Sequence, residues 1–398
     1  MAQTPITVRG DVDERAVAQL RRCAEAGGAV AGVLCADGHV GYSQPIGGAV
    51  AYPDHISPSG VGYDIGCGNK AVRTELRVDE VRAELPRIMD TIVERVSFGV
   101  GRHNDEPVDH PVLDRIAQTD FAPQRKLAGL ARKQLGTVGA GNHYVDLFAG
   151  DDGLVWVGVH FGSRGFGHRT ASGFLALAAG RRFDDRAPDG AMDAPPVLLH
   201  VDSELGQAYV GAMELAGAYA YAGRDVVVDR VLDVLGARAT YEVHNHHNFA
   251  WRERHHGTDV WVVRKGCTPA FPGQEGFVGA TMGEPSVVLR GTDDPAGAEL
   301  LHSTVHGAGR VMSRRQAAGR RVKGGGRIGG LIDFPAVRRD LAGQGVELRG
   351  GDADEAPDAY KRLDAVLAAH GPTIEVLHRL TPIGVAMAGP DVRDPYKD

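Results

Sequence analysis

The sequence predicts a single large domain in which helices and strands are mixed. It has 398 residues, of which 43% are hydrophobic and 24% charged, a composition typical of a globular chain that forms one large domain or two ordinary ones. Helical periodicity alternates with short apolar runs along its length. No linker divides the chain cleanly and no internal repeat is present, so residues 1–398 are treated as one domain.

The N-terminal part of the chain predicts a helix, then strands and loops, then two more helices. The first helix has Asp11 as its expected cap, apolar residues at helical spacing, and Gly27 as its stop. Residues 31–70 are rich in glycine and alternate short apolar runs with turns, which indicates strands and functional loops. Residues 79–96 have a helical pattern that Pro86 interrupts, so a second helix is expected to start at this proline.

The remaining elements are expected to alternate between strand and helix. Residues 155–160 are a short apolar run that predicts a strand ending on a histidine. Residues 205–235 are rich in alanine and predict a helix, with a break allowed near Gly223. A further strand is expected at residues 259–264, and residues 299–318 are expected to be partly helical.

Charge and cysteine content narrow the class of protein. The formal net charge is -7, which argues against a protein that coats nucleic acid with its whole surface but leaves room for a local basic groove. No segment has the roughly 18 apolar residues of a membrane span, and the N-terminus has no signal-peptide pattern, so no membrane contact is expected. The cysteines show no disulfide framework, which favours a reduced, cytoplasmic compartment; they are Cys23, Cys35, Cys67 and Cys267.

A glycine-rich loop over residues 60–68 places a carboxylate and a thiol three residues apart. Small residues let the backbone bend so that Asp64 and Cys67 can reach one ion. Together with imidazoles, this donor set suits Mn, Fe, Zn or Co. The alternative for this segment is a turn with a capping aspartate and a buried cysteine.

Five histidines lie in segments that are candidates for metal binding. His143 and His160 each lie beside glycines, where an imidazole can ligate a metal while loop N–H groups face a phosphate. In a strand, His244 and His246 would point to one side and His247 to the other, so the three cannot all ligate one ion without a bend. Hydrogen-bonded structural histidines, or a histidine cluster without metal, are the alternatives.

His306 is followed by a G-x-G sequence and then by arginines. An imidazole can attack a phosphoanhydride to form a phosphoramidate, glycines allow a nucleotide to approach, and arginines neutralise phosphate charge. The alternative is a helix start with incidental basic residues. The basic run that follows is a candidate for contacts with an RNA backbone or else a solvated charged face; its cations are Arg310, Arg314, Arg315, Arg320, Arg321, Lys323 and Arg327.

Taken together, these segments resemble the RtcB family of RNA ligases. The matching stretches occur in the family's order between residues 37 and 389; they are DGHVGYSQPIGG, ISPSGVGYDIGCG, GAGNHY, HFGSRGFGH, HHNFAWRE, RKG, TMGEPS, STVHGAGRVMSR and APDAYK. Neither a Walker-type phosphate loop nor the K-x-D-G motif of lysine-adenylating ligases is present. The resemblance implies one large α+β domain with the family's own architecture.

The resemblance also implies roles for individual residues. Two Mn²⁺ ions would be bound by Asp64, Cys67, His143, His160 and His247. His306 would be the nucleophile that takes GMP from GTP. The guanylate would be contacted by Asn142, Asn248, Thr281, Ser286 and Tyr360, with Ala308 and Gly309 near it.

The implied activity is ligation in tRNA splicing or RNA repair. The implied partner is RNA with a 2′,3′-cyclic phosphate or 3′-phosphate at one end and a 5′-hydroxyl at the other, and an activating protein is a further partner. The chain departs from the family's pattern in several places, one of them Val305, which precedes His306 where the family often has a small polar residue or a cysteine. Residues 381–389 lack the lysine that contacts guanine in the family, Asp146 stands for a glutamate, and Thr281 stands for a serine but keeps the hydroxyl.

These departures keep three alternatives open. The first is a divergent relative that caps or repairs ends as a nucleotidyltransferase. The second is a metal-dependent phosphodiesterase without a ligation step. The third is a non-catalytic RNA-binding protein, and the presence of every metal-ligand type and of His306 argues against it.

Overall fold

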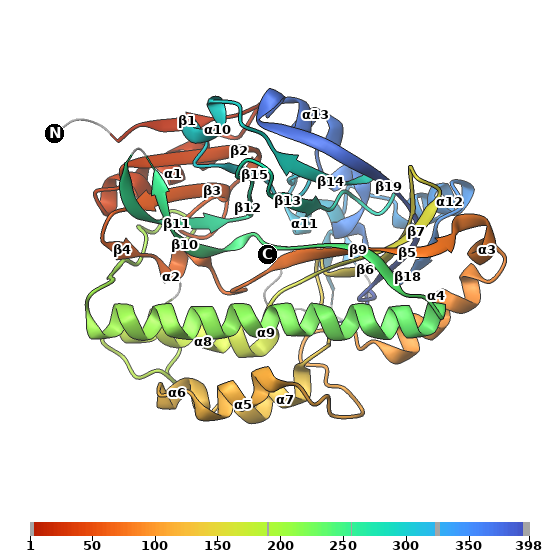
Figure 1. Cartoon of the computed structure of the whole chain (residues 1–398), viewed down its shortest axis with the longest axis horizontal. Coiled ribbons are helices and arrows are strands. Elements are labelled where there is room, and N and C mark those ends of the chain that lie inside the picture. Colours follow the sequence, from red (N-terminus) through yellow and green to blue (C-terminus); the bar gives the residue numbers. More distant parts are fainter. Residues whose placement is uncertain (1–3, 189–190, 256, 323–326, 393–398) are drawn as a thin grey trace.

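A computed structural model describes residues 4–188, 191–255, 257–322 and 327–392 of the chain. Two sheets lie side by side above one long helix, and a second layer of short helices lies beneath that helix (Figure 1). This arrangement confirms the predicted mixture of α and β structure. Among the described residues, no helix has the length and hydropathy that crossing a lipid bilayer requires.

The smaller sheet has five strands and is mostly antiparallel. Its strands, in spatial order, are β1 (Ile6–Val8), β2 (Ala31–His39), β3 (Ile46–Tyr52), β11 (Thr258–Lys265) and β10 (Asn248–His255). The strand predicted at residues 259–264 is β11, and the glycine-rich segment 31–70 supplies β2 and β3, so both predictions are confirmed. The antiparallel pairing of β10 with β11 places Asn248 opposite Lys265, at the end of the sheet that faces the larger one.

The larger sheet has eight strands. Its strands, in spatial order, are β13 (Glu275–Val278), β14 (Ser286–Gly291), β19 (Ile374–Met387), β6 (Tyr144–Gly150), β7 (Leu154–Phe161), β5 (Gly68–Arg77) and β9 (Ala239–His246), with β18 (Glu347–Arg349) also paired to β19. The strand predicted at residues 155–160 is β7. Strand pairing brings together segments that are far apart in sequence, because His160 lies opposite Tyr144 on one side and Asn69 on the other.

The long helix α9 (Glu204–Leu235) supports both sheets (Figure 1). Its first half packs in one apolar cluster with the five-stranded sheet, where Tyr219 and Val263 are both buried. Its second half packs in another cluster with the eight-stranded sheet, where Val228 and Val157 are both buried. Burial of a continuous apolar surface along one helix therefore fixes the two sheets relative to each other.

Helix α9 is continuous through Gly223, so the break allowed there is absent. Ser203 caps its start by accepting a hydrogen bond from the Gly206 backbone N–H, and Gly236 ends it in the left-handed conformation, with φ 64°. At Gly223 a Cβ would lie 3.3 Å from the ring of Phe161 in β7. This glycine therefore allows close contact between helix and sheet, and the packing outweighs its low helix propensity.

Local sequence signals correctly predicted the positions of the N-terminal helices. Helix α1 (Glu14–Ala26) ends at Gly27 as predicted, but its cap is Asp13, whose carboxylate accepts from the Arg15 backbone N–H at 2.8 Å; the expected cap Asp11 was wrong by two residues. The segment 79–96 forms two helices, α3 (Val78–Arg82) and α4 (Leu85–Arg95), with Pro86 in the first turn of the second. Both observations follow from the fact that proline and capping residues act locally.

The other elements are short. The remaining helices are α2 (Pro58–Val61), α5 (Pro111–Gln118), α6 (Ala122–Arg125), α7 (Ala128–Gln134), α8 (Arg164–Ala178), α10 (Ala296–Glu299), α11 (Arg314–Ala318), α12 (Phe334–Gly343) and α13 (Leu363–Ala368), with 3₁₀ turns at Ala353–Glu355, Pro357–Ala359 and Gly371–Thr373. Two-stranded pairs are β12 (Cys267–Pro269) with β15 (Ser303–Val305), β4 (His55–Ile56) with β8 (Leu199–His200), and β16 (Arg320–Arg321) with β17 (Arg327–Ile328). Residues 299–318 are thus partly helical, as predicted.

Candidate active site

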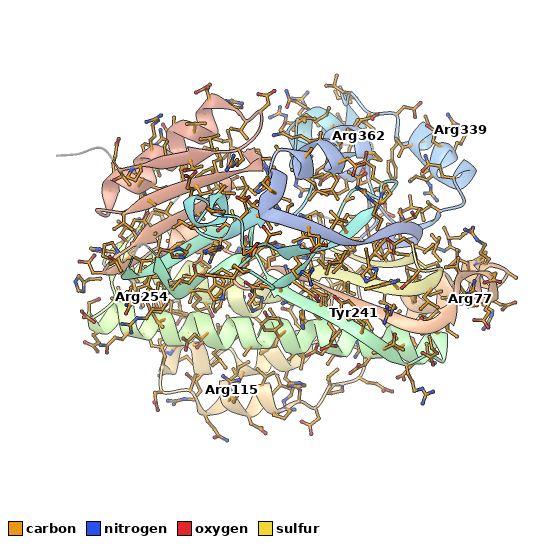
Figure 2. The ribbon with its side chains drawn as sticks, turned by 45° about the horizontal axis from the view of Figure 1, so that its top comes forward. Arg77, Arg115, Tyr241, Arg254, Arg339 and Arg362 are labelled. Carbon is orange, nitrogen blue, oxygen red and sulfur yellow. The ribbon has the colours of Figure 1, made fainter. Side chains whose placement is uncertain are left out.

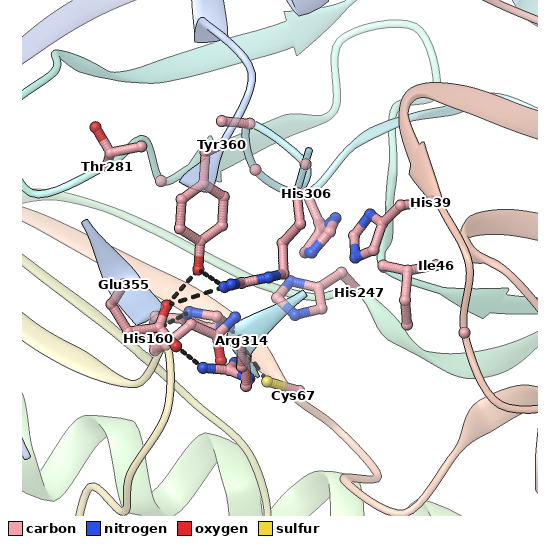
Figure 3. Close-up of a pocket in the computed structure, with 18 of the residues that line it drawn as sticks. His39, Ile46, Cys67, His160, His247, Thr281, His306, Arg314, Glu355 and Tyr360 are labelled. Atoms are coloured by element: carbon pink, nitrogen blue, oxygen red, sulfur yellow. Dashed lines mark hydrogen bonds and ion pairs between the residues drawn. The ribbon is translucent and has the colours of Figure 1, made fainter. Parts of the chain in front are cut away.

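A pocket of about 670 Å³ gathers nearly all the residues that the sequence singled out. It is lined by Asp64, Cys67, Asn142, His143, His160, His247, Asn248, Thr281, His306, Ala308, Gly309 and Tyr360. Figure 3 shows Cys67, His160, His247 and His306 directed towards this space from different segments. Ser286 does not line the pocket; its hydroxyl accepts from the Ala280 backbone N–H at 3.0 Å and so holds the loop that carries Thr281.

The metal-ligand candidates come from the ends of neighbouring strands. Cys67 immediately precedes β5, His160 is near the end of β7, and His247 directly follows β9. Because these strands are adjacent, their ends bring the three side chains to one place. Gly162 keeps the space open for Asp64, since a Cβ at residue 162 would lie 2.2 Å from the Asp64 Oδ1 atom.

The donor atoms of these side chains form two groups that share one thiol. Asp64, Cys67 and His143 form one group, Cys67, His160 and His247 form the other, and the ligand atoms within each group lie within 4.8 Å of one another. The Cys67 Sγ is 3.3 Å from His160 Nε2 and 3.7 Å from His143 Nε2. His143 Nε2 is also 3.2 Å from Asp64 Oδ2.

Backbone carbonyls fix the orientation of two of these imidazoles. His143 Nδ1 donates to the Val138 carbonyl at 3.0 Å, and His160 Nδ1 donates to the Asn142 carbonyl at 3.0 Å. With the proton held on Nδ1, the Nε2 atom of each ring carries the lone pair that faces Cys67, as in metal-binding histidines. His247 Nδ1 is buried and has no hydrogen-bond partner among the described residues.

The histidine cluster divides as its strand position predicted. His244 and His246 turn towards α9, where they accept hydrogen bonds from Arg224 at 2.8 Å and 3.0 Å. His247 turns the other way, and its ring centroid lies 5.2 Å from that of His160 and 4.8 Å from that of His306. Only His247 of the three lines the pocket.

His306 is held by a buried aspartate to which the sequence assigned no role. The Oδ2 atom of Asp37 accepts from the His306 Nδ1 at 2.6 Å and from the His306 backbone N–H at 3.0 Å. Burial raises the pKa of Asp37, but the neighbouring His306 outweighs this and holds that pKa below its usual value. Gly309, with φ 79°, is required beside it, because a Cβ there would lie 2.3 Å from the Asp37 carbonyl oxygen.

The opposite wall of the pocket carries a tyrosine and paired charges (Figure 3). The hydroxyl of Tyr360 accepts from Arg310 Nη1 at 2.8 Å and donates to Glu355.

Asn248 bridges the two sheets, since its Oδ1 accepts from the Gly266 N–H at 2.7 Å and its Nδ2 donates to the Asp64 carbonyl at 3.4 Å.

Besides His247 Nδ1, several buried polar atoms beside the pocket have no hydrogen-bond partner among the described residues, and three of them lie on strands and loops of the eight-stranded sheet. These three are Tyr144 Oη, Asp146 Oδ1 and Thr281 Oγ1. Burial raises the pKa of the Asp146 carboxyl well above its usual value. Because unpaired buried polar groups are destabilising, these atoms indicate a polar ligand.

Three arginines of the basic run lie next to acidic side chains. Arg314 pairs with Asp354 at 2.9 Å, Arg310 lies 3.7 Å from Glu355, and Arg327 pairs with Asp352. These acidic partners lie far along the chain, 40 residues from Arg314 to Asp354 and 25 from Arg327 to Asp352, so local sequence patterns do not predict the pairs. Lys323 and the side chain of Arg321 lie outside the described residues. Other arginines are dispersed, and those labelled in Figure 2 lie on separate parts of the molecule.

The buried histidines predict a dependence of stability on pH. Burial lowers the pKa of His160, His246 and His247 well below the usual value. At a pH below about 6.5 the unfolded chain binds protons at these residues while the folded chain does not, so stability is full above that pH and is lost as the pH falls. In chelator-treated protein, the free energy of unfolding by urea should decrease as the pH falls from about 7.5 to about 5.5. The slope of this decrease should correspond to the uptake of more than one proton on unfolding.

A matched variant tests this interpretation. Burial and the nearby Arg224 lower the pKa of His244, so this residue should contribute to the same slope. In His244→Gln the amide oxygen can still accept from Arg224, but the proton-binding group is gone. The variant should therefore show a shallower slope, and a slope equal to that of the unmodified protein would contradict the assignment.

Comparison with known proteins identifies the family. A family model described as tRNA-splicing ligase RtcB matches residues 19–122 and 114–388. The tRNA-splicing ligase RtcB of Archaeoglobus fulgidus is 30% identical, with 90% of this chain and 87% of the relative covered. The RNA-splicing ligase RtcB of Escherichia coli is 30% identical, with 86% of each covered, and that of Mycobacterium tuberculosis is 32% identical, with 87% and 94% covered. This chain therefore belongs to the RtcB family.

Proposed function

We propose that this chain is a GTP-dependent RNA ligase that forms a covalent guanylate on His306 and joins 2′,3′-cyclic phosphate or 3′-phosphate RNA ends to 5′-hydroxyl ends. The names of its relatives support ligation of RNA. The observation that carries the proposal is the His306–Asp37 pair, with 2.6 Å between His306 Nδ1 and Asp37 Oδ2, in the same pocket as the metal-ligand candidates. With Nδ1 engaged, Nε2 is the nitrogen that remains to attack phosphorus.

The donor set fits divalent metal ions. Two overlapping groups that share Cys67 supply thiolate, carboxylate and imidazole, and the unpartnered Nδ1 of His247 has a use as a ligand. We infer that Asp64, Cys67, His143, His160 and His247 hold two Mn²⁺ ions. When bound, these ions would neutralise charge on phosphate oxygens and stabilise the thiolate form of Cys67, whose pKa burial otherwise raises.

The proposed reaction starts at His306. Its Nε2 attacks the α-phosphorus of GTP, so that an N–P bond forms and the P–O bond to pyrophosphate breaks. Asp37 stabilises the positive charge that develops on the imidazole, as a carboxylate does when it orients a catalytic histidine. Because Asp37 is already bonded to both Nδ1 and the backbone N–H, the ring does not need to reorient.

The RNA then passes through three chemical steps. Water attacks the 2′,3′-cyclic phosphate, the P–O2′ bond breaks and O2′ takes a proton, which leaves a 3′-phosphate. An oxygen of that phosphate attacks the GMP phosphorus, which breaks the N–P bond and returns the electron pair to His306. The 5′-hydroxyl oxygen of the second RNA attacks the activated 3′-phosphorus, its proton passes to solvent, and the P–O bond to GMP breaks, so that GMP leaves as the phosphodiester forms.

The unpartnered polar atoms support a nucleotide subsite beside His306. Tyr144, Asp146 and Thr281 offer hydroxyl and carboxyl groups on one wall. Asn142, Asn248 and Tyr360 lie in the same pocket, with Ala308 and Gly309 following His306 directly. We propose that these residues contact the guanylate, and that Ser286 acts through the loop that it holds.

The direct test is covalent labelling. Purified full-length protein is incubated with Mn²⁺ and α-labelled GTP and resolved on a denaturing gel. An adduct that is labile to acid and stable to alkali supports a phosphoramidate on histidine. Absence of any adduct in protein shown to contain metal would contradict the proposal and favour a phosphodiesterase without ligation.

Loss of the shared thiol should weaken metal binding strongly. Cys67→Ala removes the one donor that belongs to both groups, and thiolate is the most metal-selective ligand in the set. Because even residues that only orient a ligand contribute about 10- to 100-fold to metal affinity, the loss here should exceed 100-fold. Competition titration with a chromophoric chelator measures it, and Cys23→Ala, a buried thiol away from the pocket, is the matched control.

The missing lysine predicts a change in nucleotide selectivity. Met387 lies in the segment where the family has its lysine, faces the pocket, and is paired with Tyr144 across the β19–β6 ladder. This observation favours the second candidate function, a nucleotidyltransferase that does not require guanine. Met387→Lys should raise labelling by GTP relative to ATP, and Met387→Leu should not. An unchanged ratio in both variants would mean that residue 387 does not contact the base.

A further inference from the structure

Arg224 is a fully buried arginine in the middle of α9 with acceptors on three different segments. It is 0% exposed. Its Nη1 donates to the carbonyls of Gly66 at 2.9 Å and Phe161 at 2.6 Å, and its Nη2 lies 3.0 Å from His246 Nδ1, which is also 2.9 Å from the Gly66 carbonyl oxygen. Its Nε donates to His244 Nε2 at 2.8 Å.

Three of these four acceptor residues are chain neighbours of a metal-ligand candidate. Gly66 directly precedes Cys67, Phe161 directly follows His160, and His246 directly precedes His247. One guanidinium group therefore contacts all three segments that build the group Cys67, His160 and His247. Its hydrogen bonds are with imidazoles and carbonyls, and its Cζ atom lies 5.1 Å from the centroid of the Tyr221 ring.

We propose that Arg224 is a positioning residue of the metal centre, whose planar guanidinium sets the spacing of the Cys67, His160 and His247 segments. This inference rests on the proposed function in so far as these residues bind metal. The guanidinium presents its donors in a fixed fork, so four acceptors at 2.6–3.0 Å define the relative positions of three backbones. A lysine ammonium lacks that planar geometry.

Charge and geometry make opposite predictions here. A buried cation close to bound metal ions repels them, so a purely electrostatic effect of Arg224 would weaken metal binding, and a neutral substitute would strengthen it. A positioning effect predicts the reverse, because ligands that are held in place bind metal more tightly. Arg224→Met removes both charge and fork, and Arg224→Lys removes only the fork.

Arg230 is a matched control on the same helix. It is partly buried and donates to the Gly136 carbonyl at 3.0 Å and to Asn104 at 3.1 Å. Like Arg224, it donates a hydrogen bond to a backbone carbonyl, but none of its acceptors is a chain neighbour of a metal-ligand candidate. Arg230→Met therefore reports the effect of losing a hydrogen-bonded arginine from α9 without disturbing the metal centre.

In the experiment, full-length protein is titrated with Co²⁺, and binding is followed by the thiolate-to-cobalt charge-transfer absorption. Competition with Mn²⁺ is measured in parallel. Unfolding of the chelator-treated protein is measured as well. Arg224→Met and Arg224→Lys should each lower cobalt affinity by about 10- to 100-fold and shift the absorption band. Arg230→Met should retain both. Wild-type affinity and band shape in the Arg224 variants would overturn the inference, as would rescue by lysine, because the planar fork would then not be required. Tighter cobalt binding in Arg224→Met would overturn it too and would assign the effect to charge repulsion.

Two further results separate the possible failures. If unmodified protein shows no thiolate band at all, the proposed metal site itself fails, irrespective of Arg224. If the Arg224 variants do not fold, as judged by circular dichroism, His246→Ala removes one acceptor while the guanidinium stays. An intermediate loss of cobalt affinity in His246→Ala then supports the inference, and unchanged affinity overturns it.

Discussion

Replacing His306 by alanine should abolish covalent labelling by GTP. The imidazole is the only protein group in the proposed reaction that bonds to phosphorus, and its neighbours cannot substitute for it because His247 and His160 are directed to the metal centre. Metal content should be unchanged, since His306 belongs to neither ligand group. Labelling with α-labelled GTP and metal analysis of the same preparation measure both effects.

The control for this variant is a histidine in the same pocket. His39 also lines the pocket, and its Nδ1 donates to the Asp37 carbonyl at 2.9 Å. His39→Gln keeps a donor at that position and should retain labelling. Normal labelling of His306→Ala would contradict the choice of nucleophile. If labelling were lost in His39→Gln at the same time, His39 would be the nucleophile instead.

Replacing Asp37 by asparagine should slow formation of the guanylate by on the order of 10³- to 10⁴-fold, by analogy with other catalytic histidines that lose their orienting carboxylate. Asp37 Oδ2 accepts both the Nδ1–H and the backbone N–H of His306. An amide in its place favours the wrong tautomer and cannot stabilise the imidazolium. Single-turnover labelling at saturating GTP measures the rate.

This prediction requires a control for the loss of a buried carboxylate. Glu253 is such a group, paired with Arg264 at 2.6 Å and with His255 at 2.7 Å, and it does not line the pocket. Glu253→Gln should lower stability but keep the labelling rate. A labelling rate in Asp37→Asn within a few-fold of the unmodified rate would show that His306 does not depend on this carboxylate.

Short-range patterns in the sequence predicted much of the fold. Helical periodicity and the proline at residue 86 located α1, α3 and α4, and apolar runs located β7 and β11. These features depend on neighbours in the chain. The alternation of side chains along a strand likewise predicted that His247 would point away from His244 and His246, which is what β9 shows.

Contacts between segments that are far apart in the chain could not be predicted from the sequence. The partner of Asp37 is 269 residues away, and no local pattern marks this aspartate as different from a buried turn residue. Arg224 lies in an alanine-rich helix, and nothing in the surrounding sequence distinguishes it from an ordinary helical arginine. The break allowed at Gly223 was wrong because contact with Phe161 favours a glycine inside the helix. Three arginines of the basic run looked unpaired because their acidic partners, Asp352, Asp354 and Glu355, lie outside the run.

The position of β19 has a consequence for how the protein matures. This strand, Ile374–Met387, follows β14 and β6 in the chain, yet it lies between them in the interior of the eight-stranded sheet. The metal-ligand candidates and His306 all precede it in the chain. A growing chain that does not yet contain β19 therefore exposes two unpaired strand edges, and such edges favour aggregation. The eight-stranded sheet should consequently be completed only after β19 has been synthesised, and deletion of residues 374–387 should unfold the sheet.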